Sequence, residues 1–335
     1  MKRLVILAPN WLGDAVMALP AIADVGRAAP DAHIAVAARP AIAPLFALVP
    51  AVNETIVLER HASVGRVSTW GGLGAELSGR GFDSALLFPN SMHAALIVAR
   101  AGITERWGYR TSWRGSLLTR AVDPPSGLHQ VAYYQHLVEA LGFANGSPEP
   151  RVVVPETATR AAESILTDAG WTGTAPFVAI APGAAYGGAK RWPPRSFAEV
   201  ADALAADGVR SILIGSAADA ATGREVMDRI TRRDSILNLI GRTDLPALAG
   251  ILARCRALIT NDSGAMHLAA AIGVPVTAVF GPTDERATRP IGDQHAIITH
   301  HVWCRPCMLR ECPLEHQCMR GVTSETVLVA ARRAL

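Results

Sequence analysis

The stretch Asn261–His267 (NDSGAMH) combines residue types that bind anions. It stands between two short apolar runs, Ala257–Thr260 and Val276–Phe280, which predict buried strands. Ser263 is a good candidate for the N-cap of the intervening helix, and His267 lies one turn later on the same side. Free backbone N–H groups and the positive end of a helix dipole make such a turn a phosphate site. The alternative is an ordinary capped helix with a hydrogen-bonded histidine.

A second loop, Pro182–Pro193, follows the predicted strand Phe177–Ala181 and combines glycines with cations. Its glycines let the backbone approach a ligand closely. Lys190 and Arg191 add the charged donors that a diphosphate requires. The loop lacks the G-x-x-x-x-G-K-[ST] pattern of a P-loop. We therefore expect a diphosphate contact of another kind here, and the alternative is a flexible loop with solvated charges.

Asp14 ends a third loop, Asn10–Asp14, which follows the predicted strand Leu4–Ala8 and precedes a helix. Gly13 permits a tight turn at this point. Asp14 is either the N-cap of that helix or a general base at the mouth of a cleft. A positioned base typically contributes about 10²–10⁴-fold to a rate. From this loop alone the N-cap is the favoured interpretation.

Two further loops are candidates for nucleoside contacts. Gly215–Asp219 follows a predicted strand, and Asp219 is placed either to bind a ribose hydroxyl or to cap a helix. Leu239–Thr243 is a candidate for the adenine region. These loops contribute Ser216, Asp219 and Gly241 to the candidate binding residues.

Short apolar strands alternate with amphipathic helices along both halves of the chain, and Gly273 and Pro275 mark the end of one such helix. This pattern predicts an α/β protein of two doubly wound parallel sheets. Ligands of such sheets bind beyond the carboxyl ends of the strands, where the loops above lie. The proline-rich stretch 145–156 resembles an interdomain linker. We expect domains over residues 1–155 and 156–322, with a helix in 323–335 as a candidate to pack back on the first domain.

The composition indicates a globular protein, with 335 residues, 50% of them hydrophobic and 18% charged. The net charge of +3 is too small to indicate nucleic-acid binding by itself. The N-terminus imitates a signal peptide, but Pro9, Asn10 and Gly13 interrupt its apolar run. The chain has no apolar stretch of the roughly 18 residues that span a membrane. We therefore expect a soluble cytoplasmic protein.

Basic and aromatic residues alternate in one part of the first half. The arginines are Arg100, Arg106, Arg110, Arg114 and Arg120, and the aromatic residues are Trp107, Tyr109 and Trp113. Such a mixture suits phosphorylated sugars and an anionic membrane surface. Arg110 and Arg114 are the candidate ligands, and the alternative is a solvated basic face.

Four of the five cysteines share one segment: Cys304, Cys307, Cys312 and Cys318. Their spacing is compatible with a structural Cys₄ zinc site, with His316 as a substitute ligand. The segment lacks the paired C-x₂-C knuckles of a zinc ribbon. Reduced thiols and redox-labile disulfides are the alternatives, and stable disulfides are less expected in a reducing cytoplasm.

Three motifs taken together resemble the bacterial ADP-heptose:lipopolysaccharide heptosyltransferases, and type II among them most. They are N-W-L-G-D-A at Asn10–Ala15, P-G-A-x-Y-G-x-A-K-R-W-P at Pro182–Pro193, and N-D-S-G-x-M-H-L-A-A at Asn261–Ala270. The resemblance covers nearly the whole chain. It implies the GT-B fold, in which two Rossmann-like domains face each other across a cleft.

The resemblance also implies an inverting transfer of heptose from ADP-L-glycero-β-D-manno-heptose to the first heptose of the lipopolysaccharide inner core on lipid A. Asp14 matches the family's candidate base, Lys190 its diphosphate-binding lysine, and Asp262 the residue near the donor sugar. The other candidate substrate-binding residues lie in the loops described above: Gly183, Tyr186, Ser216, Asp219, Gly241, Ser263, Gly264, Ala265 and His267.

Inversion at an anomeric carbon needs one base and a stabilised diphosphate leaving group. The helix start at Ser263 and the Lys190 ammonium together replace the metal ion that many other glycosyltransferases use. We therefore expect no cofactor and no obligatory catalytic metal. The alternatives are type I or III with a different acceptor, a non-catalytic nucleotide-sugar binding module, and a zinc-stabilised nucleic-acid binder. The small charge and the absence of a reading motif argue against the last.

Overall fold

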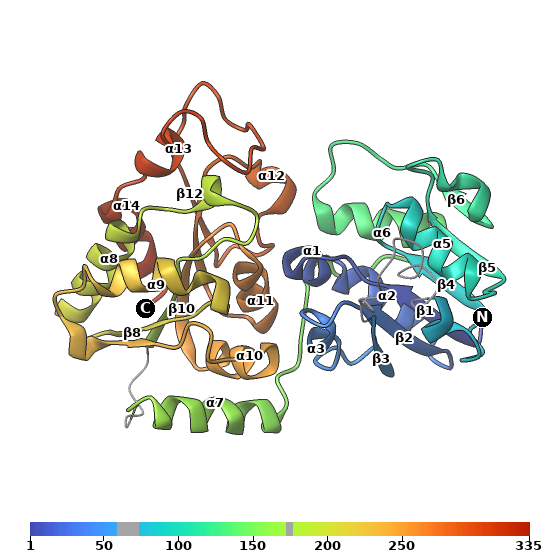
Figure 1. The fold of residues 1–335 in the computed structure, drawn as a ribbon, viewed down its shortest axis with the longest axis horizontal. Coiled ribbons are helices and arrows are strands. Elements are labelled where there is room, and N and C mark those ends of the chain that lie inside the picture. The colour runs from blue at the N-terminus through green and yellow to red at the C-terminus, as the bar shows by residue number, and fades with distance from the viewer. Residues whose placement is uncertain (59–73, 172–176) are drawn as a thin grey trace, which may run out of the picture. The chain divides into compact units, whose positions relative to one another are not determined.

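The computed structural model describes residues 1–58, 74–171 and 177–335. The chain divides into two units, Met1–Val153 and Val154–Leu335 (Figure 1). The linker composition predicted a boundary after residue 155, which is two residues beyond the observed boundary after Val153.

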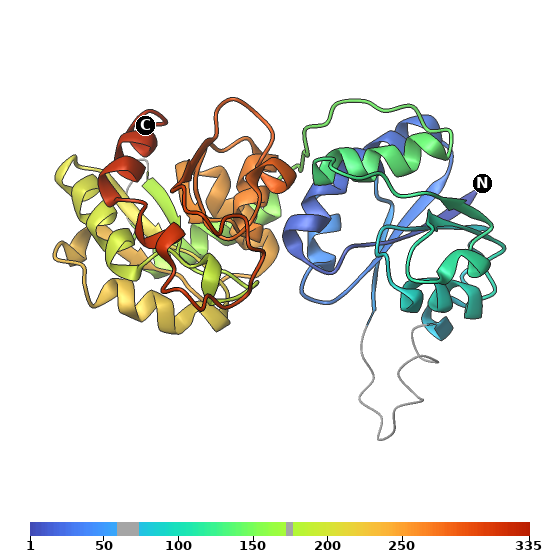
Figure 2. The same cartoon turned by 90° about the horizontal axis from the view of Figure 1, so that it is seen from above.

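The first unit is built on a parallel sheet that has six strands within the described residues, in the order β3-β2-β1-β4-β5-β6. The strands are β1 (Arg3–Leu7), β2 (His33–Ala38), β3 (Glu54–Val57), β4 (Ser84–Leu87), β5 (Glu105–Tyr109) and β6 (Arg120–Val122). The helices are α1 (Leu12–Met17), α2 (Leu19–Ala28), α3 (Ala43–Phe46), α5 (Met92–Arg100) and α6 (Gln130–Ala140). Helices α2 and α6 pack together on one face of the sheet, and α5 lies on the other (Figure 2).

The second unit repeats the plan, with the strand order β12-β11-β10-β7-β8-β9 in its described part. Its strands are β7 (Phe177–Ala181), β8 (Arg210–Leu213), β9 (Ile236–Asn238), β10 (Cys255–Asn261), β11 (Val276–Phe280) and β12 (Ala296–Thr299). Its helices are α7 (Glu156–Asp168), α8 (Pro194–Ala206), α9 (Ala220–Met227), α10 (Leu245–Ala253), α11 (Gly264–Ile272), α12 (Glu285–Thr288), α13 (Gln317–Arg320) and α14 (Ser324–Arg332).

Numbered within each unit, both sheets have the order 3-2-1-4-5-6, which is the Rossmann-like arrangement. All neighbouring strands are parallel, and β4, β7 and β11 are buried along their whole length. This confirms the predicted fold class. The strand order reverses between β1 and β4 in the first unit and between β7 and β10 in the second. Ligands of doubly wound sheets bind at the carboxyl side of this reversal.

Three strands were not expected from the sequence: β5, β6 and β12. Strand β5 (ERWGY) is buried only over its last three residues, and charged residues occupy its start. Strand β6 has no fully buried residue. In β5 and β6, charged residues therefore interrupt the apolar run that predicts most of the other strands.

The C-terminal helix α14 packs in the core of the second unit, and the candidate packing of residues 323–335 on the first domain stays a prediction. Val327 and Ala331 are buried in the same core cluster as Phe197 and Val200 of α8. An ion pair between Arg332 and Asp207 (Nη2 to Oδ2, 2.7 Å) closes the contact. The narrow apolar stripe of α14 packs against the apolar face of α8.

Within the parts of the chain that the structure describes, no helix is both long and apolar enough to cross a bilayer.

Candidate active site

A buried ion pair lies at the strand-order reversal of the second unit. Lys190 follows β7, Asp262 follows β10, and the Lys190 Nζ lies 2.5 Å from the Asp262 Oδ2. Their side chains are only 13% and 6% exposed. Thr283, which follows β11, donates its hydroxyl to the same Oδ2 at 2.6 Å. A buried pair is stable only when further hydrogen bonds offset its desolvation, and Thr283 supplies one.

The Lys190 ammonium has three N–H donors, and Asp262 accepts one of them. The ring centroid of Tyr186 lies 4.7 Å from the Nζ, so the aromatic face attracts the same charge. The arrangement holds a cation in a fixed position with donors to spare for phosphate oxygens.

Helix α11 begins directly after this pair. Ser263 is its N-cap, as predicted, and its hydroxyl accepts a hydrogen bond from the Met266 N–H at 3.4 Å. Gly264 and Ala265 therefore occupy the first turn, where backbone N–H groups have no partner within the helix. His267 follows in the same helix and is buried. The predicted anion-binding helix start is thus next to Lys190 and Asp262.

Asn261 joins the two loops, a role that the sequence analysis missed. Its Nδ2 donates to the carbonyl of Pro182 at 2.8 Å and of Gly183 at 3.3 Å. Its Oδ1 accepts from the Trp192 backbone N–H at 3.0 Å. Asn261 is fully buried, so it fixes both ends of the lysine loop. Its place at the start of the N-D-S-G motif was the available signal.

The loops after β7, β8 and β9 come together around Asp219. Its Oδ2 accepts from the backbone N–H of Ser216 at 2.9 Å and from the Ser216 hydroxyl at 2.7 Å, as a capping box. A Cβ on Gly183 would lie 2.1 Å from the Asp219 Oδ1, so only glycine fits there. Gly241 (φ +75°) donates its N–H to the Gly215 carbonyl at 2.9 Å. Asp219 therefore has the capping role that the sequence left open beside the ribose contact.

Asp14 lies in the first turn of α1 at the carboxyl side of the first sheet. The N-cap of α1 is Trp11, so the N-cap interpretation of Asp14 was wrong. The Asp14 carboxylate lies near Tyr134 of α6. Burial first, and then the negative charge of Asp14, raise the pKa of the Tyr134 hydroxyl well above its ordinary value. This strand end also carries Asn90, which the sequence did not single out and which donates to the Tyr133 hydroxyl at 2.8 Å.

The chain matches the description "Glycosyltransferase family 9 (heptosyltransferase)" over residues 70–318. This chain belongs to that family. The lipopolysaccharide heptosyltransferase 2 of Salmonella typhimurium is 31% identical, with 88% of this chain and 87% of that protein aligned. The lipooligosaccharide heptosyltransferase 2 of Haemophilus influenzae is 30% identical over 88% of each chain. The solved E. coli ADP-heptose lps heptosyltransferase II is 30% identical, with a TM-score of 0.84 over 100% of this chain and 98% of that one.

The resemblance stated from the three motifs is therefore confirmed, and so is the assignment as a glycosyltransferase. Both family 9 motifs of the second unit, around Lys190 and around Asp262, meet at one strand-order reversal. The motif of the first unit places Asp14 at the equivalent reversal of the other sheet.

One candidate acceptor ligand of this family 9 chain, Arg114, is a structural residue. Its side chain is fully buried and donates to the carbonyl groups of Tyr109, Pro89 and Ser91. Burial lowers the pKa of its guanidinium to about 10, so it stays charged at neutral pH. The expected surface position of Arg114 was wrong because β5 and β6 turn this stretch inward.

Arg110 and Trp113 remain at the surface. Arg114 ties the turn that carries them to the loop after β4. Trp113 is 95% exposed, and Ser112 and Trp113 both have left-handed backbone (φ 49° and 60°). Residues other than glycine rarely adopt this backbone conformation, so contacts with neighbouring residues must hold the turn in it. The turn therefore exposes the Trp113 indole three residues after Arg110.

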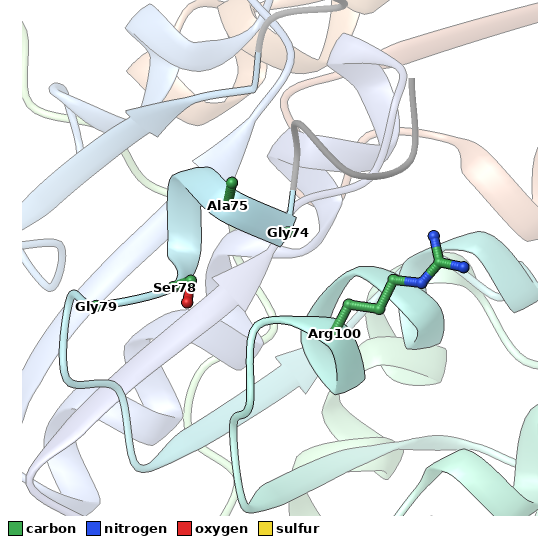
Figure 3. Close-up of a pocket in the computed structure, with 5 residues that line it drawn as sticks. All are labelled: Gly74, Ala75, Ser78, Gly79 and Arg100. Atoms are coloured by element: carbon green, nitrogen blue, oxygen red, sulfur yellow. The ribbon is translucent and has the colours of Figure 1, made fainter. Parts of the chain in front are cut away.

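The five arginines do not form one patch. Arg100 ends α5 at the amino side of the sheet, where it lines a surface pocket with Gly74, Ala75, Ser78 and Gly79 (Figure 3). The Arg106 guanidinium donates hydrogen bonds to the carbonyl groups of Leu117, Ile103 and Thr104. Of the two named candidates, only Arg110 follows the carboxyl end of β5 with an exposed side chain.

The Cys₄ zinc site stays a prediction for the four-cysteine segment. Within residues 1–58, 74–171 and 177–335, no group of three or more His, Cys, Asp or Glu side chains is arranged to hold a metal ion. All five thiols are free. Burial first, and then the neighbouring thiols of Cys312, Cys304 and Cys307, raise the pKa of the buried Cys318 thiol, while those three cysteines are half-exposed.

Proposed function

We propose that this family 9 enzyme transfers L-glycero-D-manno-heptose from ADP-heptose to the first heptose of the lipopolysaccharide inner core, with inversion. The observation that carries the proposal is the Lys190–Asp262 pair beside the start of α11. A cation with spare donors next to free helical N–H groups suits a diphosphate. The names of the relatives, heptosyltransferase 2 and ADP-heptose heptosyltransferase II, support this donor and this type.

In the proposed reaction, an acceptor hydroxyl oxygen attacks the anomeric carbon of the donor heptose. The bond between that carbon and the phosphate oxygen breaks, and ADP leaves with the electron pair. Asp14 accepts the hydroxyl proton as general base. Lys190 and the first turn of α11 stabilise the negative charge that develops on the diphosphate. Asp262 holds Lys190 in place and lies near the donor sugar.

The other candidate residues divide between the nucleotide and the acceptor. We assign the nucleoside to the loops of Gly183, Ser216, Asp219 and Gly241, and the lysine-side wall of the diphosphate site to Tyr186. We assign Arg110 and Trp113 to the acceptor, because an exposed cation and an exposed indole in the same turn suit a phosphorylated sugar. The acceptor is lipid-linked, so the enzyme works in the cytoplasm at the surface of the inner membrane. No nucleic acid takes part.

The test is transfer from ADP-heptose to two purified acceptors, Kdo₂-lipid A and its mono-heptosylated form. We expect product only with the mono-heptosylated acceptor. Transfer to Kdo₂-lipid A would instead assign type I. Binding of ADP-heptose without transfer to either acceptor would favour type III or a binding module.

Charge reversal at Arg110 (Arg110→Glu) should raise the acceptor KM about tenfold, because a charge-assisted hydrogen bond is worth roughly 1.5–3 kcal/mol. Trp113→Ala should act in the same direction, and neither variant should change the donor KM. Steady-state kinetics with each substrate varied in turn measure both constants. Arg100→Glu is the matched control, since Arg100 lies at the amino side of the same sheet and Arg110 follows the carboxyl end of a strand. Unchanged acceptor kinetics in both variants would contradict the acceptor assignment.

Removal of divalent metal should leave the transfer rate unchanged. The reason is that Lys190 and the start of α11 supply positive charge for the leaving diphosphate. The measurement is the initial rate in excess EDTA, with an EDTA-plus-Mg²⁺ reaction as control. Loss of activity with EDTA and its recovery with Mg²⁺ would show that a metal ion is required.

A further inference from the structure

The cysteine-containing segment lies against the lysine loop, although more than a hundred residues separate them in the chain. The Tyr186 hydroxyl donates to the Met308 carbonyl at 2.8 Å. The Gly188 backbone N–H donates to the Glu311 Oε1 at 3.1 Å, and the Ala189 N–H donates to the carbonyl of Arg310 at 2.9 Å. These three contacts cover the stretch immediately before Lys190.

The approach is close enough to constrain residue size. A Cβ on Gly187, whose φ is +156°, would lie 2.4 Å from the Arg310 carbonyl oxygen. The Arg310 guanidinium carbon lies 5.2 Å from the Tyr186 ring centroid, and the Lys190 Nζ lies 4.7 Å from the same centroid. One aromatic ring therefore attracts a cation from each of the two segments.

The other end of the segment holds the loop after β11. The Arg305 side chain, 10% exposed, donates to the Gly281 carbonyl at 2.7 Å and forms an ion pair with Glu285 at 2.5 Å. The Met308 backbone N–H donates to the Pro282 carbonyl at 2.9 Å. The next residue of that loop is Thr283, whose hydroxyl donates to Asp262.

Residues Arg305–Glu311 thus contact both loops that determine where the Lys190–Asp262 pair lies. We propose that Arg305–Glu311 is a positioning clamp for the diphosphate site, one that sets Lys190 and Asp262 in place before the donor binds. The clamp rests on the proposed function, because the diphosphate is assigned to Lys190 there. The clamp includes Cys307 and so gives this part of the cysteine segment a role.

Glu311 offers the sharpest test, because its carboxylate oxygen accepts the Gly188 N–H and a glutamine oxygen can do the same. Glu311→Ala should weaken ADP binding about tenfold, which corresponds to the loss of one hydrogen bond to a charged group. Glu311→Gln should stay within about twofold of the wild type, because it loses only the charge. Isothermal calorimetry with ADP measures both. Arg320→Ala removes an exposed ion pair with Glu315 and is the control that should bind ADP normally.

Amide hydrogen exchange of residues 183–190 in the free enzyme tests the clamp without any ligand. Glu311→Ala should speed exchange in this loop, and Glu311→Gln should restore protection. Unchanged exchange and unchanged ADP affinity in Glu311→Ala would overturn the clamp. Equal loss in the alanine and glutamine variants would also overturn it. If wild-type enzyme does not bind ADP, the assigned donor fails, and the exchange result still decides for or against the clamp.

Discussion

Asp14→Asn should lower kcat at least about 10²-fold while ADP affinity stays unchanged. Asparagine keeps the size of the side chain but cannot accept the acceptor proton. The affinity stays because the assigned nucleotide residues all lie in the other unit, Val154–Leu335. The measurements are the rate of heptose transfer at saturating substrates and ADP binding by calorimetry.

Loss of stability cannot account for an effect of this size. Asp14 lies in the first turn of α1, where an acidic side chain stabilises a helix by about 0.3–1 kcal/mol. A 10²-fold loss in rate corresponds to about 2.7 kcal/mol of transition-state free energy. The control is Asp31→Asn, an exposed aspartate of the same unit, which should keep full activity. Full activity in Asp14→Asn would return Asp14 to a structural role in α1.

Lys190→Met should reduce kcat by about 10²–10³-fold and weaken ADP binding, because it removes the cation assigned to the leaving diphosphate. It should also lower the free energy of unfolding by up to about 3 kcal/mol. The reason is that Asp262, 6% exposed, would keep a buried charge with only the Thr283 hydroxyl beside it. Transfer kinetics, calorimetry with ADP and urea denaturation measure the three quantities.

The double variant Lys190→Met/Asp262→Asn separates stability from catalysis. It removes both charges, so its free energy of unfolding should recover most of the loss while transfer stays low. Arg191→Met is the matched control, because Arg191 is the adjacent cation and its side chain is exposed. If Arg191→Met lost as much activity as Lys190→Met, the diphosphate would have to be assigned to both cations of the loop and not to Lys190 alone.

Several parts of the site follow from the sequence because they depend on residues a few positions apart. Ser263 caps α11 and Gly273 ends it with a left-handed backbone, as their residue types indicate. The strands β7 and β11 were predicted with their observed bounds, because each is a continuous apolar run between turn residues. The three motifs were sufficient for the family, since their order and spacing are properties of the chain itself.

The tertiary structure alone decided which loops meet. Thr283 donates to Asp262 because β11 lies next to β10, and the local sequence carries no sign of that pairing. Arg114 is buried because β5 and β6 place it under the loop after β4. The charged residues of these two strands kept them from being predicted. The cysteine spacing suggested only a zinc site, and it gave no sign that the fold places that segment on the lysine loop. Local periodicity and capping act within one or two turns of chain. Contacts between distant loops are set by strand order, which brings together residues that no spacing connects.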